Sequence, residues 1–286
     1  MKRISLYLLA FFLLTISTVG WTSCPEGQEE NDRTGECEPI KGSAKAKKSL
    51  SSGSGWRFER SLPVGAKKHG YQVVSAPEHP VRYGKKSERF EVRPGDCSRS
   101  KISSWSDCKH DKERSELGQY QWQREGHEYW YRWSIYIPKN HQNLAPVYTV
   151  YGQFHQVKCQ PAFQFIEKSH YWGLALAIWR TITNDGIVHW NELLEPKRFV
   201  GKWNDFVVHA RWTRKNDGWF KVWVNGEEKI AYSGKTMSCD KVYFKYGIYR
   251  SSVSMNPDSK TVTTIAYYDG VVRSKSKEGM FDPLPE

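Results

Sequence analysis

The sequence predicts an all-β fold in which two sheets pack as a sandwich of jelly-roll type, with a concave groove for a substrate. Many short segments alternate polar and apolar residues with the two-residue period of a strand, and turn residues separate them. Apolar residues at helical spacing are scarce, and we expect only one short helix, at 191–198. Such a pattern in a chain of 286 residues is typical of one large β domain.

The predicted strands follow one another from Trp56 onwards. Arg89–Arg93 alternates polar and apolar side chains and ends at a Pro-Gly turn. Asn225-Gly226 is the clearest hairpin signal, because this pair adopts the backbone of a tight β-turn and lies between two apolar segments. The other predicted strands are 128–137, 147–155, 174–181, 206–213, 219–224, 242–249 and 261–272.

The N-terminal residues predict export rather than structure. Lys2-Arg3 precedes the apolar run Ile4–Ile16, which is typical of a signal peptide over residues 1–20 and too short for a membrane span. Residues 21–55 are a small cysteine-containing segment and a linker rich in Ser, Gly, Ala and Lys, and residues 56–286 form the domain. We expect a secreted or periplasmic protein without a membrane span, and Cys24 leaves lipidation open.

Six cysteines in an exported chain predict disulfides. Proximity along the chain favours Cys24–Cys37 and Cys97–Cys108, which leaves Cys159 to pair with Cys239, although other pairings remain open. No pair of cysteines has the spacing of a zinc site. We expect no required cofactor, and a structural calcium ion held by Asp and backbone oxygens is compatible with the sequence.

The charge predicts an acidic partner. The chain carries 43 Lys and Arg against 31 Asp and Glu, a net charge of +12, together with 13 Trp and 16 Tyr. Aromatic rings stack on sugars and basic groups pair with carboxylates, so an acidic polysaccharide fits this composition, although charge alone is equally compatible with a role in solubility. The basic run Lys45–Lys48 lies in the linker, and we expect no nucleic-acid partner. We expect a monomer.

Polar side chains of three predicted strands fall on one face of each strand. They are Arg114 and Glu116 in the first, Gln153 and His155 in the second, and Tyr243, Lys245 and Tyr249 in the third. A cation, an amide, an imidazole and a phenol on one sheet face can hold a carboxylate and move protons beside it. This set of side chains is suited to an elimination reaction on a uronic acid.

Such an elimination needs a group that neutralises the C6 carboxylate, a base at C5 and an acid at O4. Gln153 and Arg114 are the candidate neutralisers. His155 is the candidate base or a further neutraliser, and Tyr249 is the candidate acid, whose pKa a nearby cation such as Lys245 would lower. Sugars with the C5 proton and O4 on one side of the ring could use the tyrosine for both steps, whereas opposite sides would require both residues. The sequence does not choose between them.

Each of these residues also has a purely structural interpretation. Arg114 and Glu116 could pair across a sheet, and His155 is one of nine histidines. Arg132 and Arg211 alternate with apolar neighbours and are further candidates for facing the groove.

Three motifs resemble those of the jelly-roll polysaccharide lyases. Arg114-Ser-Glu-Leu is similar to the R-[ST]-E-L-R strand of alginate lyases, with Gly118 in place of the last arginine. Gln153-Phe-His is similar to their Q-[IV]-H strand. Tyr243-Phe-Lys-Tyr-Gly-Ile-Tyr is similar to their Y-F-K-A-G-x-Y strand, but Arg250-Ser departs from the usual ending.

The wider context, from about Trp56 to about Val272, resembles the heparin lyase I-like and glucuronan lyase group. The similar strings include Arg89-Phe-Glu-Val-Arg-Pro-Gly-Asp and Gly218-Trp-Phe-Lys-Val-Trp-Val-Asn-Gly. The resemblance implies β-elimination on a polymer of uronates, with glucuronan favoured over alginate or a glycosaminoglycan. The residues that it implies are Gln153, His155 and Tyr249 for catalysis, and Arg114, Lys245 and Glu116 for the substrate subsite.

Two other function classes compete with a lyase. A non-catalytic carbohydrate-binding jelly roll would keep the aromatic and basic groove but would not need the histidine and tyrosine. A retaining glycosidase would need two carboxylates about 5–5.5 Å apart, which no strand of this sequence supplies.

Overall fold

The computed structural model describes residues 28–30, 37–39, 58–119, 121–167 and 173–282. The chain divides into two units, residues 1–40 and 41–286. In the first unit, β1 (Gln28–Glu30) pairs antiparallel with β2 (Cys37–Pro39). The predicted signal peptide, the predicted linker and Cys24 lie outside the described residues.

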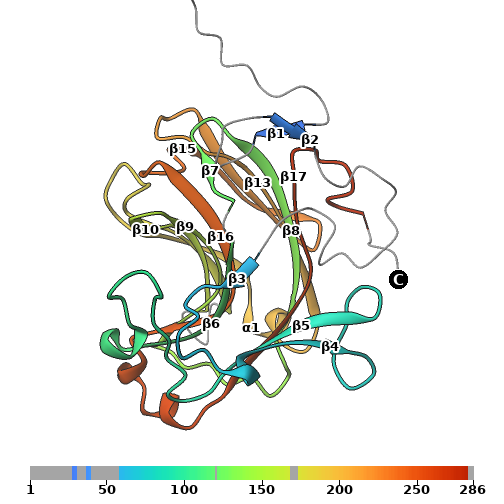
Figure 1. Ribbon diagram of the computed structural model, residues 1–286. Helices are drawn as coiled ribbons and strands as arrows, with labels where there is room; N and C mark the ends of the chain where they lie inside the picture. Colours follow the sequence, from blue (N-terminus) through green and yellow to red (C-terminus); the bar gives the residue numbers. More distant parts are fainter. Residues whose placement is uncertain (1–27, 31–36, 40–57, 120, 168–172, 283–286) are drawn as a thin grey trace, which may run out of the picture. The chain divides into compact units, whose positions relative to one another are not determined.

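The second unit contains two antiparallel sheets (Figure 1). The strands of the eight-stranded sheet are, in order, β12 (His189–Leu194), β11 (Leu174–Ile178), β10 (Cys159–Glu167), β9 (Tyr148–Gln156), β16 (Lys241–Ser251), β6 (Lys112–Gln119) and β3 (Phe58–Arg60), with β7 (Gln123–Arg124) paired to β16. The strands of the seven-stranded sheet are, in order, β15 (Glu227–Gly234), β14 (Gly218–Val224), β13 (Trp203–Arg211), β8 (Glu128–Tyr136), β17 (Thr264–Ser274), β5 (Lys86–Val92) and β4 (Tyr71–Ser75). Short helices in the described residues are α1 (Pro196–Phe199) and the 3-10 turns η1 (Lys68–Gly70), η2 (Asp107–His110), η3 (Val253–Met255) and η4 (Pro257–Lys260).

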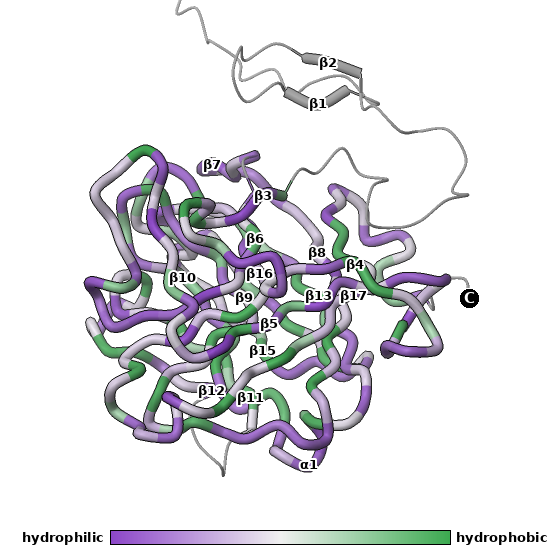
Figure 2. The backbone as a smooth tube through the Cα atoms, turned by 60° about the horizontal axis from the view of Figure 1, so that its bottom comes forward, coloured by the Kyte–Doolittle hydropathy of each residue, from purple (hydrophilic) through white to green (hydrophobic). Residues whose placement is uncertain are grey.

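The hydrophobic core lies between the two sheets. Alternate residues of each strand enter it, and the colours of Figure 2 accordingly change from residue to residue along the strands. Trp133 of β8, for example, stacks on Phe206 of β13 at 5.4 Å between ring centroids and meets the edge of Phe165 of β10 at 5.0 Å. This arrangement confirms the predicted sandwich. Because the inner faces pack together, polar side chains that alternate with the core residues project from the outer faces.

The predicted strands are found with small shifts of their ends, and the hairpin at Asn225-Gly226 is confirmed. Both turn residues have positive φ, 51° and 82°, and they join β14 to β15. The predicted helix over 191–198 is wrong for most of its length. His189–Leu194 pairs with β11 as a strand, and helix begins only at Pro196, whose fixed φ suits a first helical position. Strand β10 was not predicted.

Two disulfides of the described region match the prediction. They join Cys97 to Cys108 and Cys159 to Cys239. The third predicted pair involves Cys24 and lies outside the described part. Among the described residues, no group of three or more His, Cys, Asp or Glu side chains is placed to hold a metal ion. No helix in the same part of the chain has the length and apolar character needed to cross a bilayer.

Candidate active site

Six of the eight predicted site residues lie together on the outer face of the eight-stranded sheet. Strand β16 runs between β9 and β6, so its residues have partners on both sides. Lys245 pairs in register with Gln153 of β9, and Tyr249 pairs with Arg114 of β6. The three motifs therefore come from neighbouring strands of one sheet.

Glu116 is the centre of this cluster. Its carboxylate accepts hydrogen bonds from Gln153 Nε2 at 2.5 Å, from Lys245 Nζ at 2.6 Å and from Arg114 Nη1 at 3.0 Å. Glu116 and Lys245 are almost completely buried, with 2% and 3% of their surfaces exposed. Three donors from three strands therefore converge on a single buried carboxylate.

Asp107, at the start of η2, completes the charge balance and was not identified from the sequence. It accepts hydrogen bonds from Nε and Nη2 of Arg114, at 2.5 and 2.7 Å, and is fully buried. The neighbouring residue Cys108 ties this turn to Cys97. Two cations thus face two carboxylates, so the cluster is close to neutral.

Burial and charge act in opposite directions on the pKa values of the cluster. Burial alone would raise the pKa of Glu116, but Lys245 and Arg114 outweigh it and hold that pKa below its ordinary value. Burial lowers the pKa of Lys245 to about 8, and the attraction of Glu116 opposes the shift. At neutral pH the carboxylate is therefore ionised and most of the lysine is protonated.

His155 lies half-buried at one end of the cluster, opposite Tyr243 of β16. Its Nδ1 is 2.8 Å from the carbonyl oxygen of Gln156. A carbonyl can only accept, so Nδ1 carries the hydrogen and the lone pair is on Nε2. Burial, with a smaller contribution from Lys245, lowers the pKa of His155 to about 4. At neutral pH this imidazole is uncharged and can act as a proton acceptor.

Tyr249 lies at the other end, with its ring against the guanidinium of Arg114 at 4.4 Å. Burial raises the pKa of Tyr249 to about 12, although Arg114 acts in the opposite direction. We expected a nearby cation to lower the pKa of Tyr249 and make the phenolate accessible. This prediction is wrong, because burial raises that pKa by more than the cation lowers it. At neutral pH the phenol keeps its proton and can donate it.

A bulge sets the position of Tyr249. The register between β16 and β9 shifts between Tyr246 and Tyr249, so that Tyr249 faces Val150. Gly247 lies in this bulge with φ +123°, and a Cβ at this position would be 2.4 Å from the backbone oxygen of Ser115. Only glycine allows β6 to approach β16 so closely at this point.

Arg132 and Arg211 do not join the cluster. Both belong to the seven-stranded sheet, and both alternate with core residues, so their side chains project from its outer face. Arg132 donates to the carbonyl of Gly279 at 2.9 Å and to the hydroxyl of Tyr83 at 3.1 Å. Arg211 pairs with Asp217 at 3.5 Å. The alternation was correctly identified, but it did not reveal which sheet each arginine belongs to.

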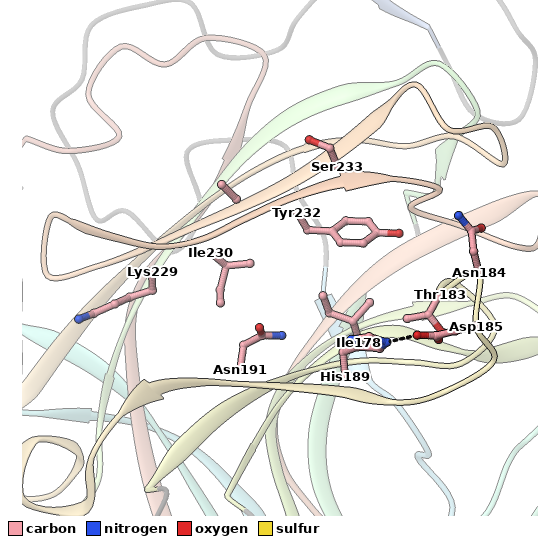
Figure 3. Close-up of a pocket in the computed structure, with 11 residues that line it drawn as sticks. Ile178, Thr183, Asn184, Asp185, His189, Asn191, Lys229, Ile230, Tyr232 and Ser233 are labelled. Atoms are coloured by element: carbon pink, nitrogen blue, oxygen red, sulfur yellow. Dashed lines mark hydrogen bonds and ion pairs between the residues drawn. The ribbon is translucent and has the colours of Figure 1, made fainter.

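Two cavities of the described part lie elsewhere. One, of about 440 Å³, is lined by residues around β12 and by β15, and includes the bonded pair Asp185 and His189 (Figure 3). The other, of about 450 Å³, lies beside His141 and Glu167. None of the eight predicted site residues lines either cavity. The cluster is part of a sheet face instead.

Comparisons with known proteins identify the family of this chain. The family model described as polysaccharide lyase matches residues 48–272. A search of curated proteins finds no match. Among solved structures, the endo-β-1,4-glucuronan lyase of the fungus Trichoderma reesei is similar with a TM-score of 0.52 and 17% identity, over 80% of this chain and 100% of that chain. An alginate lyase of Pseudomonas aeruginosa follows with a TM-score of 0.48 and 16% identity, over 77% of this chain and 98% of that one.

At such identities the structural likeness concerns the fold, whereas the family model covers most of the chain. This two-sheet protein therefore belongs to the polysaccharide lyase family and is a polysaccharide lyase.

Proposed function

We propose that this lyase is an exported enzyme that cleaves a uronate-containing acidic polysaccharide by β-elimination on the outer face of the eight-stranded sheet. The observation that carries the proposal is the cluster around Glu116, with a neutral histidine at one end and a protonated tyrosine at the other. A sugar bound over Gln153 and Lys245 would lie between these two groups.

The reaction assigns one step to each group. The amide nitrogen of Gln153 donates a hydrogen bond to the C6 carboxylate, and the positive charge of Arg114 stabilises the electron density that develops there. Nε2 of His155 removes the proton from C5. The electron pair of that C–H bond forms the C4=C5 double bond, the C4–O4 bond breaks, and the hydroxyl of Tyr249 gives its proton to O4.

Glu116 and Lys245 support this reaction from below the surface. Both are buried to the same degree as Gln153, and their role in this scheme is to hold their neighbours in place. Because Glu116 accepts from Gln153, Lys245 and Arg114 together, it holds the donors at fixed positions before the substrate arrives. Preorganised donors avoid a reorganisation cost during the reaction.

Glucuronan is the first substrate to test, because the T. reesei enzyme of similar fold acts on it. Polyguluronate is the second. The protonation states of His155 and Tyr249 suit a route with a separate base and acid, and sugars whose C5 proton and O4 lie on opposite sides of the ring require such a route. In glucuronan, as in polymannuronate, the two groups share one side of the ring, so cleavage of these polymers would assign both steps to Tyr249. Cleavage of polyguluronate alone would assign the C5 proton to His155 and the O4 proton to Tyr249.

Export is supported by the two disulfides of the domain, since such bonds persist mainly outside the cytosol. The net charge of +12 would attract an anionic polymer over a distance comparable to the Debye length. We propose that the enzyme acts as a monomer on this polymer.

The test is a digestion of glucuronan, polymannuronate, polyguluronate and a glycosaminoglycan, followed by ultraviolet absorbance of the unsaturated product and mass analysis. We expect an unsaturated oligosaccharide from at least one polymer, and no product from the same polymer after its carboxyl groups are reduced. A complete lack of unsaturated product on the whole panel would contradict the proposal.

A further inference from the structure

A row of hydrogen-bonded side chains leads from the end of β11 across β10 to the candidate site. Nε1 of Trp179, the residue that follows β11, donates to Oε1 of Gln164 at 2.6 Å. Nε2 of Gln164 donates to Oε1 of Gln153 at 3.0 Å. Nε2 of Gln153 then donates to Glu116 at 2.5 Å. The two glutamines are direct cross-strand partners in the β9–β10 register.

The two ends of this row fix its direction. An indole nitrogen can only donate, and an ionised carboxylate can only accept. Each glutamine between them offers one accepting oxygen and one donating nitrogen. Only one orientation of both amides satisfies every group, and it turns the nitrogen of Gln153 towards Glu116 and Lys245.

The row is buried, so any arrangement of the amides that leaves a hydrogen bond unmade would cost free energy. Gln153 is 2% and Gln164 is 4% exposed, and a buried amide costs free energy unless its hydrogen bonds are made. The backbone of Trp179 is held on both sides, since its N–H donates to Ala162 at 3.0 Å and its carbonyl accepts from Ile182 at 2.8 Å. The indole therefore provides a fixed donor.

We propose that Gln164 and Trp179 are positioning residues that hold the amide of Gln153 with its nitrogen towards the substrate carboxylate. One bond to Glu116 leaves the second hydrogen of that nitrogen for an incoming acceptor. Without Gln164 and Trp179, only the bond to Glu116 holds this amide, so the amide can rotate about that bond and aims its second hydrogen less precisely at the carboxylate. This inference rests on the proposed function, in which Gln153 binds the C6 carboxylate.

The test measures how strongly the protein prefers a ligand with carboxylates. This preference would stay the same if Gln164 and Trp179 only stabilised the fold. The measurement compares the Kd of a uronate oligosaccharide with that of the same oligosaccharide after reduction of its carboxyl groups. Both are measured in the non-cleaving Tyr249→Phe background, so that binding is separated from turnover. The ratio of the two Kd values reports the orientation of the Gln153 amide.

Trp179→Phe removes the indole donor and keeps an aromatic ring, and Gln164→Met removes both bonds of the amide at similar volume. With the ratio defined as the Kd of the reduced oligosaccharide divided by the Kd of the uronate, we expect each change to reduce it by roughly 10- to 100-fold, the usual value of a hydrogen bond to a charged group, mainly through weaker binding of the uronate. Because both changes break one row, the double variant should lose little more than Gln164→Met alone.

Trp190→Phe is the matched control, because Trp190 packs in the same small apolar cluster as Trp179. It should leave the Kd ratio unchanged. If the original chain cleaves a uronate polymer and Trp179→Phe and Gln164→Met both keep the original ratio, the inference is overturned and the proposed function stands. If the original chain neither cleaves uronates nor prefers them over the reduced oligosaccharide, both are overturned.

Discussion

The outer faces of the two sheets carry similar side chains and arrange them differently. On the eight-stranded sheet, donors from three strands converge on the carboxylate of Glu116. On the seven-stranded sheet, Arg132 and Arg211 each have partners of their own, and the residues around Gly279 lie over the first of them. The candidate active face is therefore distinguished by donors that converge on one carboxylate. The presence of arginine or tryptophan distinguishes it less.

Two histidines, one on the outer face of each sheet, also differ in their surroundings. His209, on the seven-stranded sheet, stacks flat on Trp130 with ring centroids 3.9 Å apart, and its Nε2 lies 2.7 Å from Glu128. His155 has its Nδ1 bonded to a carbonyl, which leaves the lone pair on Nε2. Burial lowers the pKa of both. The first ring is used in packing and in a hydrogen bond to Glu128, whereas the second has a lone pair that can accept a proton.

The largest expected effect comes from Tyr249, one of several tyrosines that lie against an arginine. Tyr249→Phe removes the proposed acid and keeps the ring against Arg114, so turnover should fall by roughly 10²–10⁴-fold with little change in the Kd of the substrate. Tyr129 of β8 is the matched control, because the guanidinium of Arg273 lies 4.4 Å from its ring, the same distance as in the Arg114 pair. Tyr129→Phe should change turnover less than threefold. Equal losses in steady-state kinetics would mean that the phenol of Tyr249 has no special part in the reaction.

The next effect concerns stability. Glu116→Gln leaves Lys245 buried without its carboxylate, so the free energy of unfolding should fall by about 3–5 kcal/mol. Asp217→Asn breaks the more exposed pair with Arg211, which solvent screens, and should lower the free energy of unfolding far less. Urea denaturation measures both. A double variant with Glu116→Gln and Lys245→Met should recover part of the loss, and an equal cost for the two single variants would contradict the assigned role of the cluster.

A smaller effect should appear on acidification. The pKa of His155 is about 4 in the folded protein and near 6.5 in the unfolded chain, so the unfolded state binds more protons between these values. Stability therefore rises with pH through this window, and acidification from pH 6.5 to 4 should cost about 3 kcal/mol from this residue alone.

His155→Asn should flatten this part of the stability profile. His209→Asn should flatten it less, because the bond to Glu128 opposes the shift of the His209 pKa. Chemical denaturation at several pH values provides the comparison. An unchanged slope in His155→Asn would mean that this histidine is not held uncharged by the fold.

The contrast between the faces also explains what could be predicted from the sequence. Alternation along Arg114-Ser-Glu and Gln153-Phe-His correctly placed their polar residues on one face, because strand period is a local property. The sheet to which Arg132 and Arg211 belong depends on which distant segments pair as strands. Local alternation does not predict that pairing. The net shift of the Tyr249 pKa depends on burial, which required the packed structure.

The same reason explains the residues that were missed. Asp107 reaches Arg114 from a 3-10 turn, and Trp179 reaches Gln164 from beyond the end of β11. Neither lies in a polar strand motif. A local signal for a short helix at 191–198 was also overruled, since pairing of β12 with β11 gives its backbone better partners.

The bulge at Gly247 has a consequence for how this enzyme can change over time. Any side chain there would meet the backbone of Ser115 and the ring of Phe90, and the φ of +123° is unfavourable for every other residue. A library randomised across residues 243–249 and selected for lyase activity should therefore return glycine alone at position 247. Substrate range can diversify in the loops around the sheet, while the spacing between Lys245 and Tyr249 stays fixed for every descendant of this sequence.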